Sequence, residues 1–261
     1  MAKSTEAWTD ENEKQWKQRM TQLFESHLQN AFETYESPLE VGNRLGDVLR
    51  GAEVEVANLV VPRSVRKWAS LENLSRWEDL LKDENMLLDL RTISTSIANT
   101  MRPLAGNKFA MWITEVLNIA FNQHNLSLHC LTKGKIKSDL AKRLIVTPID
   151  GNTKRDYKPD IDIIVVNNTT DKPIAILSAK TTLAERVMQT INWKRYKDQL
   201  PQDLRDLKLY LVTAWETFPA GKVNRERVQE LDGTYVCNTR AELYGNIKLF
   251  ESIIDDLKAL I

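Results

Sequence analysis

The chain has 261 residues, of which 42% are hydrophobic and 28% charged, and its formal net charge is zero. This is the composition of an ordinary globular protein, and its neutrality excludes a general polyanion-binding coat while leaving room for a local basic groove. Cys130 and Cys237 lie far apart without a CxxC motif, which excludes a zinc ribbon and fits a reducing cytoplasm. The charged opening "EAWTDENEKQWKQRM" and the lack of a long apolar run predict a soluble protein with no signal peptide or membrane span.

The first residues have helical periodicity. Large apolar residues recur every four positions from Trp16 to Phe32, so residues 5–37 predict one helix or two. Pro38 and Gly42 then interrupt the pattern. We therefore expect a helix boundary in this interval.

Helical periodicity resumes over residues 41–59 and 64–81, on either side of Pro62. The first ninety or so residues thus have the texture of an all-helical segment. We expect an α-helical accessory region at residues 1–95 and an α/β core at residues 96–261.

An amphipathic helix is predicted over "GNKFAMWITEVLNIAF". Phe109, Ile113 and Val116 fall on one apolar stripe, and Gly106 precedes the periodic residues. Glu115 lies within this helix. Its ordinary interpretation is a side chain that faces solvent.

From Ser127 the pattern changes to strands, in the segments "LSLHCLT", "DIDIIVV", "IAILSA" and "LKLYLVTAWE". A helical stretch separates the last two, so residues 174–216 predict a strand, a helix and a strand joined by a right-handed crossover. The sequence therefore predicts a central mixed β-sheet flanked by helices.

The stretch "YKPDIDIIVVNNTTDKPIAILSAKTT" predicts a β-hairpin, because turn residues separate two runs rich in β-branched side chains. If the turn is centred near Thr170, Asp160 lies opposite Lys180 and Asp162 lies opposite Ser178. Alternation puts these four side chains on one face of the hairpin, at its open end. That end is a polar site on the rim of a buried sheet.

A carboxylate beside an amine suits phosphodiester hydrolysis. The carboxylate can bind Mg²⁺, which polarises the phosphate and activates a water, while the lysine places that water and offsets developing charge. The structural alternative is an ordinary cross-strand salt bridge, which contributes roughly 0.2–1 kcal/mol.

"KPDIDIIVV" followed across the hairpin by "ILSAK" resembles the PD-(D/E)xK nuclease signature. The continuation, "SAKTTLAERVMQ", resembles type II restriction endonucleases that cut CCGG-containing or related sites, the group of NgoMIV, EcoRII and AgeI, and most nearly the BsaWI-like enzymes. The resemblance implies a restriction-endonuclease-like fold in which residues 96–261 form the catalytic core. It also implies that Asp160 and Lys180 are catalytic, that Asp160 and the backbone carbonyl of Ala179 bind Mg²⁺, and that Asp162 and Ser178 are further candidates.

Ser178 stands where the signature has a carboxylate, and a hydroxyl is a far poorer magnesium ligand. Another acid must therefore be supplied. Related helices introduced by Arg and Gly, as in "MRPLAGNKF", often provide an active-site Glu, so the resemblance favours Glu115 as a catalytic metal ligand. Glu185 is the reserve candidate.

After Lys180, Thr182 can cap a helix whose apolar positions face the sheet, which leaves Glu185, Arg186 and Gln189 to point elsewhere. In the restriction group a matching acidic and arginine pair reads C:G pairs, and the chemistry allows it, because Arg binds guanine and Glu accepts from cytosine. These four residues are therefore the DNA-binding candidates. The alternative is a surface charge pair of little energetic weight. Lysines and arginines outnumber acids from Lys180 to Lys197, which predicts a basic surface.

The resemblance as a whole implies a magnesium-dependent restriction endonuclease acting on double-stranded DNA in the cytoplasm of a bacterium or archaeon. A palindromic site matches a twofold homodimer, with higher oligomers on DNA as an extension. Two alternatives remain open. One is a repair or junction nuclease with the same core, and the other is a noncatalytic DNA-binding protein with a degraded core, which Ser178 favours.

Overall fold

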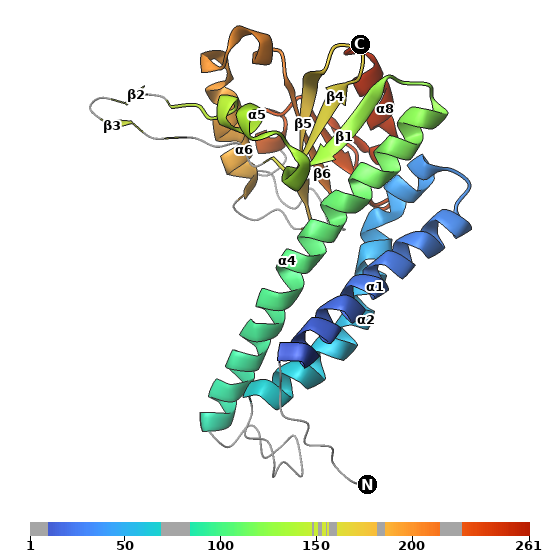
Figure 1. Ribbon diagram of the computed structural model, residues 1–261, viewed down its shortest axis with the longest axis vertical. Coiled ribbons are helices and arrows are strands. Elements are labelled where there is room, and N and C mark those ends of the chain that lie inside the picture. The colour runs from blue at the N-terminus through green and yellow to red at the C-terminus, as the bar shows by residue number, and fades with distance from the viewer. Residues whose placement is uncertain are drawn as a thin grey trace. The chain divides into compact units, whose positions relative to one another are not determined.

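The computed structural model (Figure 1) describes the backbone of residues 10–68, 84–147, 149–150, 153–154, 156, 161–181, 186–214 and 226–261. The chain divides into two compact units. The first contains residues 1–30 and 48–105, and the second contains residues 31–47 and 106–261. The sequence predicted a single boundary near residue 95, whereas these units also assign residues 31–47 to the part of the chain that carries the sheet.

Three long helices precede the sheet: α1 (Asp10–Thr34), α2 (Pro38–Trp68) and α4 (Glu84–Gln123). The predicted interruption at Gly42 is wrong, because α2 continues through it. Pro38 instead begins α2, where a missing amide hydrogen costs nothing, and the Glu40 amide donates to the Ser37 hydroxyl at 3.2 Å as an N-terminal cap. Predicted helical residues 69–81 lie outside the described part of the chain.

The predicted amphipathic helix is the last part of α4, which also contains Pro103 and Gly106. Phe109, Ile113 and Val116 are fully buried, as the apolar stripe predicted. Within the described ranges, no helix is both long enough and apolar enough to span a membrane.

Six strands form one mixed sheet in the order β1-β4-β5-β6-β7-β8. They are β1 (Leu128–Thr132), β4 (Ile163–Asn167), β5 (Lys172–Lys180), β6 (Lys208–Thr213), β7 (Gly233–Val236) and β8 (Ile247–Leu249). The pairs β1/β4 and β4/β5 are antiparallel, and the pairs from β5 to β8 are parallel. This arrangement confirms the predicted mixed sheet and the predicted strand, helix and strand over β5, α6 and β6.

Shorter elements complete the second unit. Its helices are α5 (Ser138–Arg143), α6 (Arg186–Arg195) and α8 (Ile253–Lys258), and a two-stranded hairpin is formed by β2 (Ile149–Asp150) and β3 (Thr153–Lys154). Single turns of 3₁₀ helix lie at Lys133–Lys135, Lys197–Gln199, Gln202–Leu204 and Phe250–Ser252.

One face of the sheet packs against α6. Ile164, Ile176 and Leu211 of three adjacent strands lie in one buried apolar cluster with Ile191 and Trp193 of α6. Residues two apart in a strand share a face, so the side chains of Asp162, Ser178 and Lys180 project on this same side of the sheet. The apolar cluster therefore forms the support on which the polar end of the hairpin rests.

At the β1 edge of the sheet, a side chain covers backbone groups of the edge strand. β1 is an edge strand, and the Asn118 side chain of α4 meets its outer edge: the Cys130 amide donates to Asn118 Oδ1 at 2.7 Å, and Asn118 Nδ2 donates weakly to the Cys130 carbonyl at 3.5 Å. In Figure 1 α4 passes alongside β1. An amide that pairs in this way satisfies backbone groups that would otherwise be open to another strand.

Candidate active site

The β4/β5 hairpin has the register that its sequence predicted. Ile163 pairs with Leu177 and Ile164 pairs with Ile176, so Asp162 and Ser178 are the next residues outward on the two strands. The turn is held by Asn167, whose Oδ1 accepts hydrogen bonds from the backbone amides of Thr169 and Thr170 at 2.8 and 3.2 Å. The register shifts between Val165 and Val166, so the pairing of Ile163 with Leu177 beyond this shift sets which polar groups meet at the open end.

At that open end, Asp162 and Lys180 form a close ion pair. Lys180 Nζ lies 2.5 Å from Asp162 Oδ2, and the same oxygen accepts a hydrogen bond from the Ala179 amide at 2.8 Å. The Lys180 side chain is 6% exposed and that of Asp162 is 22% exposed. Little water therefore screens the pair, and the carboxylate is held from two directions.

The acid that meets Lys180 is thus Asp162, which the sequence placed opposite Ser178. The two contacts join residues on diagonal positions of neighbouring strands, and a lysine side chain is long enough to span that diagonal. Sequence alternation correctly placed Asp162 on the same face as Lys180. Asp160, the acid predicted opposite Lys180, lies outside the described residues.

Two buried hydroxyl residues adjoin the pair. Ser178 is fully buried, and its Oγ has no hydrogen-bond partner among the residues that the structure describes. Thr213 of β6 is also fully buried and lies next to Lys180 in the parallel register. The Ala214 amide, one residue further along, donates to the Lys180 carbonyl at 3.1 Å. Lys180 is therefore fixed through its backbone as well as through its ammonium group.

Glu115 has an exposed side chain on α4. Asn118, one turn later in the same helix, contacts Cys130 of β1, and the chain turns back directly from α4 into β1. Moving from Asn118 to Glu115 therefore leads toward the end of β1 that contains Thr132, the partner of Ile163. This is the end of the sheet at which Asp162 and Lys180 meet, but no contact joins Glu115 to either of them among the described interactions.

The predicted recognition residues lie at the start of α6 or just before it. Arg186 is the first residue of α6 and Gln189 is in its first turn, with only their backbone described. Thr182 and Glu185 lie outside the described residues. The fully buried Ile191 confirms that α6 turns an apolar side toward the sheet.

The basic residues at the end of α6 contact acceptors in other segments of the chain. Lys194 Nζ donates to the Glu230 carbonyl at 2.7 Å, Arg195 forms an ion pair with the Glu230 carboxylate at 2.9 Å, and Lys197 Nζ donates to the Leu207 carbonyl at 3.0 Å. These three cations hold the crossover between β5 and β6. Their spacing in sequence contained no information about these acceptors, and the predicted basic surface over Lys180 to Lys197 stays a prediction, with the Arg195 side chain 57% exposed.

A second polar cluster lies on the other side of the sheet, by the alternation of β6. The Tyr235 hydroxyl donates to Asp256 at 2.5 Å, Lys248 pairs with the same carboxylate at 2.7 Å, and the Tyr210 ring packs edge-on against Tyr235. Burial, with the nearby charges of Asp256 and Asp232, raises the pKa of Tyr210 to about 12. Burial and donation to Asp256 likewise raise the pKa of Tyr235. Both phenols stay neutral at physiological pH, so the cluster ties β7 to α8 and supplies no general base.

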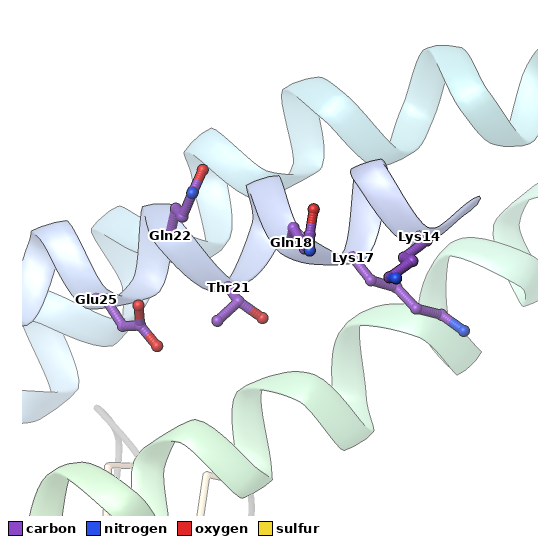
Figure 2. A pocket seen from close by; sticks show the side chains of 6 residues that line it. All are labelled: Lys14, Lys17, Gln18, Thr21, Gln22 and Glu25. Atoms are coloured by element: carbon purple, nitrogen blue, oxygen red, sulfur yellow. The ribbon is translucent and has the colours of Figure 1, made fainter. Parts of the chain in front are cut away.

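A shallow pocket along α1 is lined by the polar side chains shown in Figure 2: Lys14, Lys17, Gln18, Thr21, Gln22 and Glu25. It combines two lysines with one glutamate on a single helix, which is a common composition for a solvated helix face. Across the described part of the chain, no three His, Cys, Asp or Glu side chains are grouped as a metal site. The Asp162–Lys180 pair, whose lysine side chain is 6% exposed, is therefore our candidate site.

Residues 135–256 match the family described as BsaWI restriction endonuclease type 2. This segment includes the hairpin, α6 and the parallel strands. The chain is also 32% identical over 112 residues to MjaVIP of Methanocaldococcus jannaschii, whose name describes it as a proposed type II restriction enzyme. That match covers 39% of this chain and 49% of the relative, so the chain spans about half the length of the curated relative it matches.

Comparison with solved structures gives two restriction endonucleases bound to DNA, both at low TM-scores. One is a pre-specific complex of the restriction endonuclease BsaWI with DNA, at a TM-score of 0.43 and 11% identity, covering 91% of each chain. The other is the restriction endonuclease PspGI with substrate DNA, at a TM-score of 0.27 and 13% identity, covering 78% of this chain and 92% of PspGI.

The ion pair predicts opposite stability effects for its two members. Asp162→Asn leaves the buried Lys180 ammonium without its counter-charge, and we expect the free energy of unfolding to fall by roughly 1–3 kcal/mol. Lys180→Met removes the buried charge and leaves Asp162 its Ala179 amide, so stability should be unchanged or higher. Urea denaturation at neutral pH measures both variants. Equal losses in the two variants would contradict the assignment of Lys180 as a buried charge that depends on Asp162.

Proposed function

We propose that this protein is a magnesium-dependent type II restriction endonuclease that hydrolyses double-stranded DNA at a short palindromic site containing CCGG or a close relative. The observation that carries the proposal is the Asp162–Lys180 pair at the open end of the β4/β5 hairpin, within the segment that matches the BsaWI family. A surface salt bridge is normally exposed and weakly held. This one is mostly buried at a strand end and is held by the neighbouring backbone, which is the form that a preorganised catalytic pair takes.

The lysine has a defined task in this chemistry. Asp162 orients the Lys180 ammonium group, so that its remaining donors can place the attacking water or stabilise a phosphate oxygen. The Ala179 amide prevents Asp162 from rotating away. The pair therefore offers a positive charge at a fixed position where negative charge develops during hydrolysis.

The sequence around Asp162 and Lys180 contains oxygen donors of the type that Mg²⁺ prefers. Asp160, Asp162 and the Ala179 carbonyl would hold the ion, which when bound would polarise the phosphate and lower the pKa of a coordinated water. Asp160 remains the predicted principal ligand. Asp162 becomes a stronger candidate than its sequence position alone suggested, because it already contacts Lys180.

A further carboxylate would compensate for Ser178, whose full burial and hydroxyl chemistry make it a weak metal ligand. Glu115 is our candidate, because α4 carries it toward the catalytic end of the sheet and its side chain is exposed. Glu185 remains the reserve. If neither supplies the ligand, Ser178 favours the second candidate function, a DNA-binding protein without catalytic activity.

Recognition is assigned to the start of α6. Arg186 begins this helix only six residues after Lys180, while Ile191 anchors the helix to the sheet. Arg186 and Glu185 would read guanine and cytosine in the major groove, with Gln189 and Thr182 beside them. A homodimer would present two such helices to the two halves of a palindrome, and higher oligomers could assemble on DNA.

The catalytic prediction concerns substitutions at the open end of the β4/β5 hairpin. We expect Asp160→Asn, Asp162→Asn and Lys180→Met each to lower the cleavage rate by about 100-fold or more, because each removes a group that stabilises developing charge. Sequence-specific DNA binding should be retained. Plasmid cleavage in Mg²⁺ measures the rate, and gel shift in Ca²⁺ measures binding.

Matched controls lie at the other end of the same strands. Asp171→Asn and Lys172→Met change the same residue types near the turn, where both side chains are exposed. These two variants should cleave at the unmodified rate. Wild-type cleavage by both Asp162→Asn and Lys180→Met would remove the hairpin site. Full activity of Glu115→Gln would transfer the missing ligand to Glu185.

The recognition prediction concerns Arg186. Arg186→Ala would remove a bidentate guanine contact of roughly 1–3 kcal/mol in each half-site, so the preference for CCGG duplex over scrambled duplex should nearly vanish. Arg195→Ala, at the far end of the same helix and paired with Glu230, should leave that preference unchanged. Gel-shift titrations in Ca²⁺ give both affinity ratios. An unaltered ratio for Arg186→Ala would show that this arginine is an ordinary surface charge.

A further inference from the structure

Gly46 of α2 lies directly against the ends of β6 and β7, and β6 is the neighbour of the strand that carries Lys180. We propose that Gly46 is a positioning residue for Lys180, an inference that rests on the catalytic role proposed for that lysine. The Gly46 amide donates to the Cys237 carbonyl at 2.8 Å, a contact outside its own helix. Cys237 is the residue that follows β7. A helix can approach a carbonyl this closely only where no side chain intervenes.

The space at Gly46 is closed by backbone rather than by side chains. A Cβ atom added there would lie 2.8 Å from the Cys237 carbonyl oxygen and 2.9 Å from that of Ala214, the residue that follows β6. Both distances are shorter than real Cβ contacts allow. Because backbone atoms cannot rotate away as a side chain can, any side chain at residue 46 must move either α2 or the two strand ends.

The contacts beside Gly46 hold α2 in place. Asn43 is buried and exchanges two hydrogen bonds with Glu251, at 2.9 Å to its carboxylate and 3.0 Å from its amide. Asp47 pairs with Arg240 at 2.6 Å. A clash at residue 46 will therefore be relieved largely by the strand ends.

The strand ends lead directly to the catalytic lysine. The Ala214 amide donates to the Lys180 carbonyl at 3.1 Å, and the Cys237 amide donates to the Thr213 carbonyl at 2.8 Å. Thr213 is also the register partner of Lys180. A displacement of the Ala214 carbonyl thus moves the Ala214 Cα and amide, which donates to the Lys180 carbonyl. The shift of the Lys180 backbone then alters its side-chain contact with Asp162.

Gly42 provides a matched control, since it lies one turn earlier in α2 and contacts a different group. A Cβ atom there would meet the Phe250 ring, which contributes the three nearest atoms, the first at 2.1 Å. Gly42→Ala therefore disturbs core packing without pressing on Ala214 or Cys237. The two variants separate a loss of stability from a loss of alignment.

The experiment compares Gly46→Ala, Gly42→Ala and Lys180→Met with the unmodified protein. Single-turnover cleavage of pre-bound DNA is started with Mg²⁺ over a range of pH, and folded fraction is measured by urea denaturation. For Gly46→Ala we expect the rate to fall about tenfold to 100-fold with unchanged DNA affinity and a displaced pH–rate profile, since a small misplacement of a catalytic group has this effect. Gly42→Ala should lose stability but keep the rate and pH profile of its folded fraction.

Asp47→Ala serves as a milder variant that keeps the fold if Gly46→Ala does not, because it removes only a partly exposed ion pair beside the same contact. We expect it to lower the single-turnover rate severalfold with unchanged affinity. A folded Gly46→Ala protein with the unmodified rate, equal rate losses in both glycine variants, or an unchanged rate in Asp47→Ala would each overturn the inference. Normal cleavage by Lys180→Met would reject both the proposed function and this inference. An inactive Lys180→Met together with a fully active Gly46→Ala would reject the inference alone.

Discussion

The contact between Lys180 and Asp162 is the interaction on which the rest of the structure depends. Removing an ammonium group from water costs several kcal/mol unless an opposite charge and hydrogen bonds replace the water. At the end of β5 this replacement comes from Asp162, whose carboxylate also accepts a hydrogen bond from the Ala179 amide. A buried ion pair of this kind adds little net stability, because the desolvation of both groups offsets much of their attraction.

The fold can be understood as a set of constraints on that point. The pairing of Ile163 with Leu177 sets the register at the open end of the hairpin, and the apolar contact between α6 and the sheet covers the face on which the pair projects. The parallel strands β6 and β7 continue the hydrogen-bonded network from Lys180 through Ala214 to Cys237. Gly46 of α2 then closes the network from outside the sheet. Residues distant in sequence thereby determine the position of one lysine.

The sequence predicted the hairpin well because the signals for it were local. The turn residues fixed which positions pair, and alternation between faces followed from strand geometry. Alternation gave Asp162 the correct face, but it did not indicate that the Lys180 side chain reaches diagonally to Asp162. The continuity of α2 was missed for a different reason: the cost of glycine and proline in a helix is small when close packing requires them, as at Gly46, or when the position tolerates them, as at Pro38.

Other features had no local signal at all. β7 and β8 are short and were absent from the predicted strands, since they are defined by parallel pairing with neighbours far along the chain. The acceptors of Lys194 and Arg195 lie in a distant segment, so the sequence did not indicate that these cations contact Glu230. Charge in a sequence identifies such groups, but only the fold determines what they contact.

Digestion of a fully sequenced plasmid in Mg²⁺, followed by sequencing of the new ends, tests the central claim most directly. We expect the unmodified protein to produce breaks at one recurring short palindrome. Lys180→Met, although folded and able to bind the same DNA, should produce none. Breaks without a common sequence would contradict the assignment as a restriction endonuclease. Identical breaks from Lys180→Met would contradict the assignment of the Asp162–Lys180 pair as its active site.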